Sequence, residues 1–311
     1  SDFARDLGLP SPPLHWGAES LWEQLEPLLP GLSVEVVARS PSTYTALLER
    51  ARVVRTPEED NGAVLVRRSV ESAAFGRRAA DVQPCLLVAE HQTGGRGRHG
   101  RSWQAAKGAS LTFSLALPLH MNDWAGLSLA VGVTLADALE PDLGSAPRLG
   151  LKWPNDLWLM DRPLASPAAG PVTGRKLGGI LIETVAAGTR RLAVVGIGIN
   201  VLPLPGTEGS QCACVQEIDA GIDAPAALAR VALPLVQALK LFEREGFAAF
   251  EQRYARRDLL IGQEVRTTQA DVPEGQARGV TAQGALRVHT SGGEVLVSSG
   301  EVSVRFGLAA A

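Results

Sequence analysis

The stretch TGGRGRHGRSW, from Thr93 to Trp103, restricts the local fold more than any other part of the chain. Its four glycines make a regular helix or strand costly, because glycine loses more backbone entropy on ordering than any other residue. Its three arginines, Arg96, Arg98 and Arg101, repel one another unless an anion lies among them. The stretch therefore predicts either an anion-binding loop or a solvated turn, and a nucleic acid and a nucleotide are both open as the anion.

Two well-known phosphate-binding patterns do not fit this loop. A P-loop needs GxxxxGK followed by Ser or Thr, and that order of residues is missing. A Rossmann loop opens a helix at once, whereas the residues after Gly100 lead to the strand-like segment SLTFSLALPL at 110–119. At this stage the anion-binding interpretation rests on the arginines alone.

The rest of the chain mixes strand-like and helix-like segments without regular βαβ alternation, which predicts an α+β fold built on a mixed sheet. Apolar runs predict strands at 33–38, 84–90, 110–119, 149–160 (interrupted by Pro154), 176–185 and 190–201. Helical spacing predicts helices at 40–52, 124–140 and 224–257. Pro234 should kink or split the last of these, because proline lacks the backbone N–H that a helix interior uses.

Three domains are expected. Residues 1–32 are rich in proline around one short amphipathic segment and are expected to form a surface extension. Residues 33–262 would form the main catalytic domain, and 263–311 would form a small SH3-like β-barrel of short strands separated by glycine-containing turns. The first segment leaves too little room for a helix-turn-helix module, so no specific DNA binding is expected.

Bulk properties favour a cytoplasmic protein. The net charge is -3, whereas a dedicated nucleic-acid-binding protein is more often basic. No apolar run approaches the ~20 residues that span a membrane, and the N-terminal residues do not form a secretion signal. The three cysteines, Cys85, Cys212 and Cys214, are an odd number, which argues against a disulfide framework, and Cys212-Ala-Cys214 lacks the spacing of a zinc site.

Polar residues that a strand pattern does not require stand in four further segments. Ser42-Thr43 lies at a strand-to-helix junction, where hydroxyls also cap helices. KWPND, Lys152 to Asp156, has apolar flanks, and buried charges need partners. Lys176 in GRKLGGILIE lies either close to a ligand or at a sheet edge, where it would reach solvent. In GIGIN, residues 196–200, alternating glycines leave one face bare for a flat group or for a neighbouring element.

In this order and roughly this spacing, TGGRGRHGRSW, KWPND, GRKLGGILIE and GIGIN resemble the biotin protein ligases, in the short form without an N-terminal DNA-binding domain. The resemblance covers nearly everything from Ser33 to Phe306. It implies an enzyme that attaches biotin to a specific lysine of a biotin carboxyl carrier domain of a carboxylase. The implied route is a biotinyl-5′-AMP intermediate, with ATP converted to AMP and pyrophosphate. ATP and Mg²⁺ are the implied cofactors, and biotin is the substrate.

The resemblance also implies roles for individual side chains. Lys176 and Arg98 would be catalytic. The residues implied to bind biotin are Ser42, Thr43, Gln92, Arg96 and Lys176. Those implied to bind the nucleotide are mostly cations and amides: Arg96, Arg98, Arg101, Trp103, Lys152, Asn155, Asn200 and Arg305. Asp156 would help to hold the metal. Because water destroys an acyl-adenylate, the loop would be flexible when empty and would order over the intermediate.

The chain departs from the family pattern at two positions beside the Ser-Thr pair. Tyr44 stands where family members often have Asn, and Pro41 stands where an acidic residue is frequent, which leaves the edge of the biotin pocket open. The Pro/Gly/Ala-rich insertion at 163–174 is expected to protrude as a surface loop. A lipoate or octanoate ligase-type acyl-adenylating enzyme is the nearest alternative. Both a monomer and a homodimer remain open.

Overall fold

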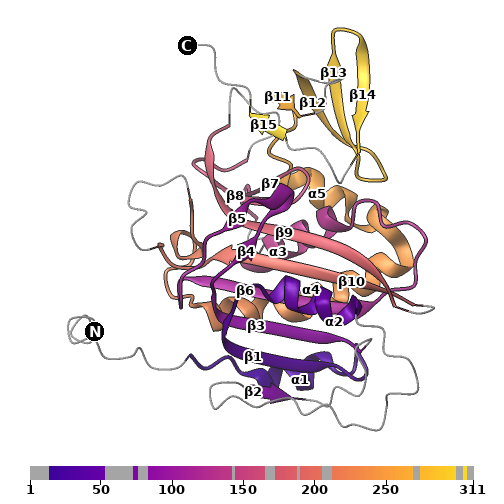
Figure 1. Cartoon of the computed structure of the whole chain (residues 1–311). Helices are drawn as coiled ribbons and strands as arrows, with labels where there is room; N and C mark the ends of the chain where they lie inside the picture. Colours follow the sequence, from indigo (N-terminus) through magenta and orange to yellow (C-terminus); the bar gives the residue numbers. More distant parts are fainter. Residues whose placement is uncertain are drawn as a thin grey trace.

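A mixed sheet of eight strands forms the larger part of the molecule, and a sheet of five antiparallel strands lies at its C-terminal end (Figure 1). The computed structural model describes residues 14–52, 73–75, 83–141, 144–164, 172–187, 190–204, 212–268, 274–298 and 304–306. The α+β prediction is therefore confirmed.

The large sheet has the strand order β2-β1-β3-β6-β10-β9-β8-β7. Only β1 and β3 run parallel, and every other neighbouring pair is antiparallel. Its strands are β1 (Ser33–Ser40), β2 (Ala73–Phe75), β3 (Cys85–Gln92), β6 (Ser110–Pro118), β7 (Leu149–Lys152), β8 (Asp156–Met160), β9 (Gly174–Ala187) and β10 (Arg190–Asn200).

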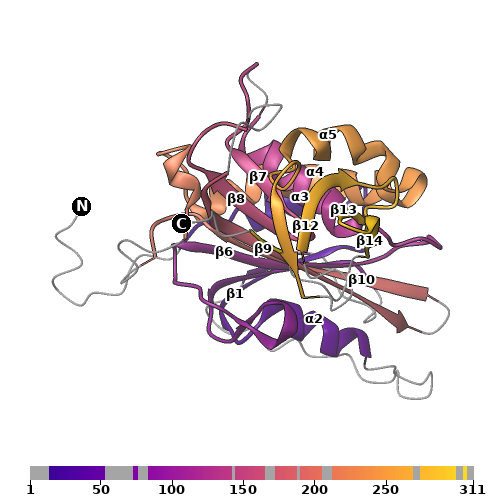
Figure 2. The same ribbon diagram turned by 90° about the horizontal axis from the view of Figure 1, so that it is seen from above.

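Helices cover both faces of this sheet, which explains why its central strands are almost continuously apolar. In β3, Leu86 and Val88 point into the larger core, whereas Cys85 and Leu87 point to the opposite face and pack in the cluster around α2 (Thr43–Arg52). Figure 2 shows α2 on one face of the sheet and α3 (Leu127–Leu139), α4 (Ala224–Glu245) and α5 (Glu251–Arg257) on the other.

The long helical region breaks at a different position from the one predicted. Pro234 lies inside the continuous helix α4, and the chain turns at Gly246, whose φ is 67° and which is followed by the short helix η5 (Gly246–Phe250). Proline removes one helical hydrogen bond. The turns around Pro234 bury apolar side chains on both sides of it, including Val231, Leu235 and Leu239, and this burial outweighs the loss. The prediction that Pro234 splits the region is wrong.

The residues before β1 are also more buried than expected. Helix α1 (Ala18–Leu25) and the turn after it place Leu21, Leu25, Leu29 and Leu32 in the main core, and the indole of Trp16 donates a hydrogen bond to Glu90 Oε1 at 3.1 Å. Apolar side chains at helical spacing buried this deeply each contribute about 1.5–3 kcal/mol. The described part of the predicted surface extension is therefore a component of the core.

The C-terminal module is an antiparallel sheet of five short strands in the order β14-β13-β12-β11-β15. These strands are β11 (Glu264–Thr267), β12 (Glu274–Val280), β13 (Leu286–Thr290), β14 (Gly293–Val297) and β15 (Val304–Phe306). No pairing joins β14 to β15 among the described residues, so closure into a barrel stays a prediction. The predicted insertion at 163–174 lies mostly outside the described residues.

Two contacts tie this module and its junction to the KWPND segment. The buried indole of Trp153 donates a hydrogen bond to the carbonyl of Gly284 at 2.9 Å, across the boundary between the two sheets. The N–H of Leu259, two residues beyond the end of α5, donates at 3.2 Å to the carbonyl of Leu151, the residue immediately before KWPND. The turn between β7 and β8 is therefore held from both sides.

Part of β9, an interior strand of the large sheet, has an unpaired edge. β10 pairs with nearly the full length of β9, but β8 reaches only as far as Gly179. From Leu181 onward, the outer edge of β9 pairs with no strand within the described ranges. An exposed strand edge is a template for pairing with another chain.

By length and composition, the stretch Ala224–Arg257 is apolar enough to cross a membrane. In the fold it consists of α4, η5 and α5, and its apolar side chains, among them Leu228, Phe242 and Phe250, are buried in the main core. This burial is characteristic of a core helix.

The buried carboxyl of Asp258, at the junction between the two sheets, should make the stability of the fold depend on pH. Burial raises the pKa of Asp258 from 3.8 to about 7, against hydrogen bonds from the N–H groups of Leu260 and Ile261. Between these values the folded state keeps a proton that the unfolded state has lost, so stability falls as pH rises, by about 1.4 kcal/mol per unit. Urea unfolding at a series of pH values should show that the free energy of unfolding of the wild type falls relative to that of Asp258→Asn as the pH rises from 4 to 7. If the free energies of unfolding of the two proteins changed in parallel with pH, the Asp258 carboxyl would not be the cause of the pH dependence.

Candidate active site

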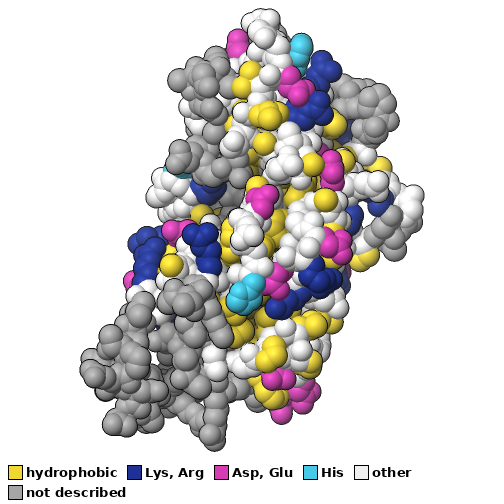
Figure 3. Space-filling model, turned by 90° about the vertical axis from the view of Figure 1, so that its right-hand side faces the viewer, with side chains coloured by type: hydrophobic (Ala, Val, Ile, Leu, Met, Phe, Trp, Pro, Cys, Tyr) yellow, Lys and Arg dark blue, Asp and Glu magenta, His cyan; other side chains and the backbone are white. Residues whose placement is uncertain are grey.

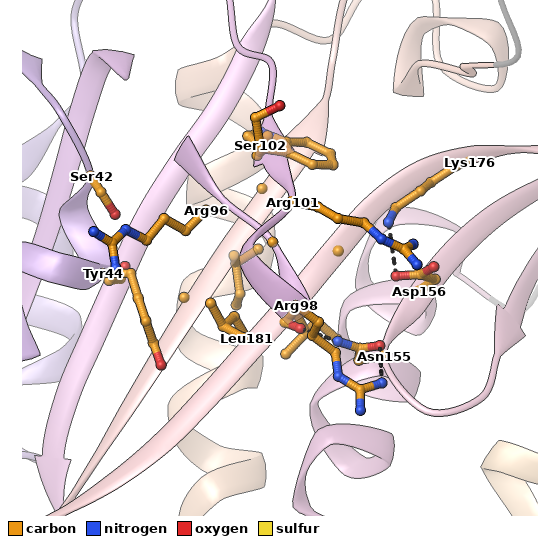
Figure 4. Close-up of a pocket in the computed structure, with 18 of the residues that line it drawn as sticks. Ser42, Tyr44, Arg96, Arg98, Arg101, Ser102, Asn155, Asp156, Lys176 and Leu181 are labelled. Atoms are coloured by element: carbon orange, nitrogen blue, oxygen red, sulfur yellow. Dashed lines mark hydrogen bonds and ion pairs between the residues drawn. The ribbon is translucent and has the colours of Figure 1, made fainter. Parts of the chain in front are cut away.

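A cavity of about 200 Å³ brings together residues from every polar segment of the sequence (Figure 4). The Gly/Arg loop, the turn after β7, the start of β9 and the end of β1 with α2 all contribute to its lining. The predicted site residues among those that line it are Ser42, Thr43, Gln92, Arg96, Arg98, Arg101, Trp103, Lys152, Asn155, Asp156 and Lys176. Segments far apart in the chain therefore meet at one place.

The Gly/Arg loop folds as a short hairpin over the sheet. β4 (Gly95–Arg96) pairs with β5 (Ser102–Trp103), and the turn η3 (Arg98–Gly100) forms its tip. This pairing places three arginines at different positions along the cavity. In Figure 4, Arg96 lies beside Ser42 and Tyr44, Arg98 lies beside Asn155, and Arg101 extends toward the end that holds Lys176 and Asp156.

Cations outnumber carboxylates in the cavity. Five Lys and Arg side chains line it, and Asp156 is the single Asp or Glu among its described lining residues. Lys176 Nζ lies 3.0 Å from Asp156 Oδ1, and Arg98 Nη1 lies 3.5 Å from Asn155 Oδ1. Arg96 and Arg101 form no ion pair with any residue in the described part of the chain. Positive side chains in a partly enclosed site favour a bound anion that completes the charge balance.

Arg98 shows the cost of this imbalance. Burial lowers the pKa of its guanidinium, the nearby Asp156 carboxylate raises it, and Arg101 lowers it again. A guanidinium stays charged in proteins, so Arg98 keeps its proton and its burial costs free energy instead. An anion bound between Arg98 and Arg101 would relieve both effects.

The opposite end of the cavity carries hydroxyl and amide groups that already hold one another. Ser42 Oγ accepts a hydrogen bond from the N–H of Thr45 at 3.1 Å and so caps α2. The N–H of Thr43 donates to Gln92 Oε1 at 3.0 Å, and Thr43 Oγ1 lies 2.8 Å from Ser114 Oγ. The sequence analysis missed Ser114. The available signal was a serine in the middle of the strand-like segment SLTFSLALPL, where a buried hydroxyl needs a hydrogen-bond partner.

Two aromatic rings cover the bare face of GIGIN. A Cβ at Gly196 would lie 2.9 Å from the Tyr44 ring, and one at Gly198 would lie 2.6 Å from the Trp103 indole. Tyr44 also donates a short hydrogen bond to Glu183 of β9. Burial and then this hydrogen bond raise its pKa. The predicted flat groups are therefore side chains of the protein itself, and both rings form part of the cavity wall.

Three predicted nucleotide residues require separate mention. Lys152 lines the cavity with its Nζ 5.2 Å from the ring centre of Trp158. Asn200 is buried at the end of β10 and is not among the described residues that line this cavity. Arg305 pairs through its backbone with Arg266 in the C-terminal module, and its side chain lies outside the described part of the structure.

Comparison with known proteins assigns the family. Residues 79–200 match the Biotin/lipoate A/B protein ligase family, and residues 260–305 match the Biotin protein ligase C terminal domain. A protein of Mycobacterium tuberculosis named Biotin--[acetyl-CoA-carboxylase] ligase is 32% identical over 298 residues, which are 92% of this chain and 91% of that protein. The chain belongs to the biotin protein ligase family. This confirms the family resemblance inferred from the four motifs.

Two further members of the family are also similar to this chain. The Bifunctional ligase/repressor BirA of Escherichia coli is 35% identical over 225 residues, which are 70% of this chain and 65% of that protein. The chain thus spans somewhat less than two thirds of that bifunctional relative. The solved structure of the biotin protein ligase from Aquifex aeolicus in complex with biotin and ATP superposes with a TM-score of 0.63. It is 25% identical and covers 88% of this chain and 99% of its own.

The ring packing on GIGIN gives a prediction that needs no ligand. Gly196→Ala should lower the free energy of unfolding by about 1–3 kcal/mol, because the new methyl group meets the Tyr44 ring. In a Tyr44→Ala background the same change should cost much less, since the ring is gone. Urea denaturation of the four proteins measures both effects.

Gly221→Ala is the matched control, because a Cβ there meets only one atom, at 3.9 Å. Equal costs of Gly196→Ala in the two backgrounds would contradict the packing account.

Proposed function

We propose that this chain joins biotin to a lysine of a biotin carboxyl carrier domain through biotinyl-5′-AMP, with ATP converted to AMP and pyrophosphate. The observation that carries this proposal is the cavity that combines a cation-rich end with an end of preorganised hydroxyl and amide groups. The names of the relatives support it, because one is called a biotin--[acetyl-CoA-carboxylase] ligase and a solved neighbour contains biotin and ATP.

The first step brings the biotin carboxylate against the α-phosphate of ATP, and a P–O bond forms as pyrophosphate leaves. Two anions approach each other only where fixed cations screen their charges. Lys176 would neutralise the carboxylate and the α-phosphate, and Arg98 and Arg101 would hold phosphate oxygens by charge-assisted hydrogen bonds. In the second step the carrier amine attacks the acyl carbonyl and AMP leaves, and Lys176 would stabilise the departing phosphate.

The hydroxyl end of the cavity fits the uncharged ring system of biotin. Ser42, Thr43 and Gln92 would bind the ureido group. Hydrogen bonds between Thr43 and Gln92, and from the N–H of Thr45 to Ser42 Oγ, already fix their orientation. Apolar residues that line the same cavity suit the thioether ring and the acyl chain: Phe113, Ile180, Leu181 and Ile197. Arg96 lies at this end beside Tyr44, and its predicted contact with biotin is part of the proposal.

We assign the nucleotide to the other end, with Arg98, Arg101, Trp103, Lys152 and Asn155. Asn200 and Arg305 stay predictions. Mg²⁺ bound to a polyphosphate usually needs only one or two protein carboxylates, and Asp156 can supply one. No group of three or more His, Cys, Asp or Glu side chains suited to a metal occurs among the described residues. A metal ion held mainly by the substrate phosphates fits this site, where it would screen their negative charge.

The acceptor must bring its lysine to the cavity mouth. A groove next to the cavity runs along the unpaired edge of β9, and its lining includes Leu181, Ile182, Glu183 and Thr184 together with Trp124. This edge offers backbone groups to an added strand of a carrier domain or of a second copy of the chain. The cytoplasmic location and the homodimer stay predictions.

The face shown in Figure 3 gives little support for the nucleic-acid alternative. On the face shown in Figure 3, Lys and Arg side chains alternate with Asp and Glu, without a broad positive patch. A non-specific nucleic-acid interface depends on such a patch. The predicted absence of specific DNA binding is kept as a prediction.

Mass spectrometry of a carrier domain tests the proposal. After incubation with the protein, ATP, Mg²⁺ and biotin, the carrier should gain the mass of biotin minus one water, on a single lysine. Lipoate and octanoate in place of biotin serve as the matched comparison. A carrier that gains lipoate or octanoate but not biotin would replace the proposed substrate with the alternative one.

Arg98→Gly should leave a folded enzyme that releases biotinyl-5′-AMP into solution. The reason is that Arg98 lies at the loop tip over the cavity and would hold the adenylate phosphate. Loss of one charge-assisted contact is worth about 1.5–3 kcal/mol, or roughly tenfold to more than a hundredfold in dissociation rate. A filter-binding assay of intermediate release measures this rate. An unchanged rate in the folded variant would remove Arg98 from this role.

A further inference from the structure

Lys176 lies where β9 loses its regular pairing with both neighbouring strands. The pairing of β10 with β9 ends at Gly178, two residues beyond Lys176. On the other side of β9, the pairing with β8 shifts register between Leu157 and Trp158, so that Leu177 is an extra residue next to Lys176. A bulge re-aims the side chains around it and weakens the local ladder. The neighbouring strands therefore fix this part of the backbone less firmly than the rest of β9.

A short returning segment, residues 212–217, takes over where β10 stops. Cys212 forms a parallel bridge with Lys176, and the N–H of Ala213 donates to the carbonyl of Lys176 at 2.8 Å. Ala213 and Val215 are buried, and the N–H of Gln216 donates to the carbonyl of Val201 at 3.0 Å. We call residues 212–217 the strap.

One ion pair fastens the strap to β9. The guanidinium of Arg175 contacts both carboxylate oxygens of Glu217, and its Nη1 also donates to the carbonyl of Cys212 at 3.2 Å. Glu217 Oε1 in turn accepts the N–H of Cys214 at 3.0 Å. Each group thus binds its partner and the strap backbone together, so the pair fixes the strap against the residue that immediately precedes Lys176.

We infer that Arg175 and Glu217 are positioning residues for Lys176. Neither side chain is among the described residues that line the cavity, so their effect on the reaction passes through the backbone of Lys176. The inference rests on the proposed function, in which Lys176 acts on the carboxylate and the α-phosphate. The motif GRKLGGILIE would then have two functions: Arg175 binds the strap, and Lys176 acts on the substrate.

The Arg175–Glu217 pair is partly exposed, so it should position Lys176 without adding much to the stability of the fold. Each partner of the pair has 34% of its side chain exposed, and exposed ion pairs add little to the stability of a fold. A loss of orientation by a fraction of an ångström, however, reduces a reaction rate strongly, because the near-attack geometry is lost. A purely structural pair would leave the rate of the first step unchanged in variants that stay folded.

The test is the single-turnover rate of biotinyl-5′-AMP formation from biotin and labelled ATP. Arg175→Gln, Glu217→Gln and the double variant should each be slower by about tenfold, with the melting temperature close to that of the wild type. The double variant should be no slower than either single variant, since the pair acts as a unit. The matched control is Arg287→Gln with Glu294→Gln, a bidentate exposed pair in the C-terminal module, which should change nothing.

The outcomes are distinguishable. A wild type that forms no biotinyl-5′-AMP would reject the proposed function. A wild type that forms it at the same rate as the folded Arg175 and Glu217 variants would reject the positioning role alone. Variants that lose melting temperature together with rate would also reject it, because the pair would then support the fold as a whole.

Discussion

Five positive side chains line one cavity in which Asp156 is the single carboxylate among the described lining residues, and this excess of positive charge constrains the rest of the site. Such an excess is unfavourable without a bound anion, because burial removes hydration from charged groups and the carboxylate of Asp156 can neutralise only one of the five positive charges. The protein retains it by placing the cations on separate elements, with Arg98 and Arg101 on the hairpin loop and Lys176 on β9. The same separation lets them surround an anion that none of these elements could bind alone.

The fold supplies rigid backbone around those cations. Trp153 joins the turn after β7 to the C-terminal module, the rings of Tyr44 and Trp103 close over the glycines of β10, and the strap fastens β9 beside Lys176. Each contact holds an element that carries a site residue and leaves the charged groups to the ligand. Catalytic groups held in this way need little reorganisation when charge develops in the reaction.

The sequence allowed the motif segments to be placed together, because glycines, arginines and Pro154 in apolar surroundings have few structural uses. The family resemblance followed from these segments, and the α+β class followed from the mixture of strand-like and helix-like segments without regular βαβ alternation; both are confirmed. What failed depended on distant contacts. The break at Pro234 was predicted from local propensity, whereas burial on both sides of it keeps α4 continuous. The first residues were predicted as a surface extension because the core that receives Leu21 and Leu25 is built from later segments.

The site shows the same division. Ser42, Thr43 and Gln92 were predicted as ligands of biotin, but the hydrogen bonds that join Thr43 to Gln92 and to Ser114 become visible only when β1, β3 and β6 are placed side by side. The strap could not be foreseen, since Arg175 and Glu217 are forty-two residues apart and each reads as an ordinary surface charge. Long-range pairing of this kind leaves no periodic signal in a single sequence.

The central claim is that the excess cations of the cavity form the phosphate site of an acyl-adenylate. A crystal structure of the protein with a hydrolysis-resistant analogue of biotinyl-5′-AMP tests it most directly. The account predicts the phosphate-equivalent group within hydrogen-bond distance of Lys176 Nζ and of Arg98 or Arg101, with the ureido ring at the end lined by Ser42 and Gln92. An analogue bound in the reverse orientation, or bound outside this cavity, would contradict it.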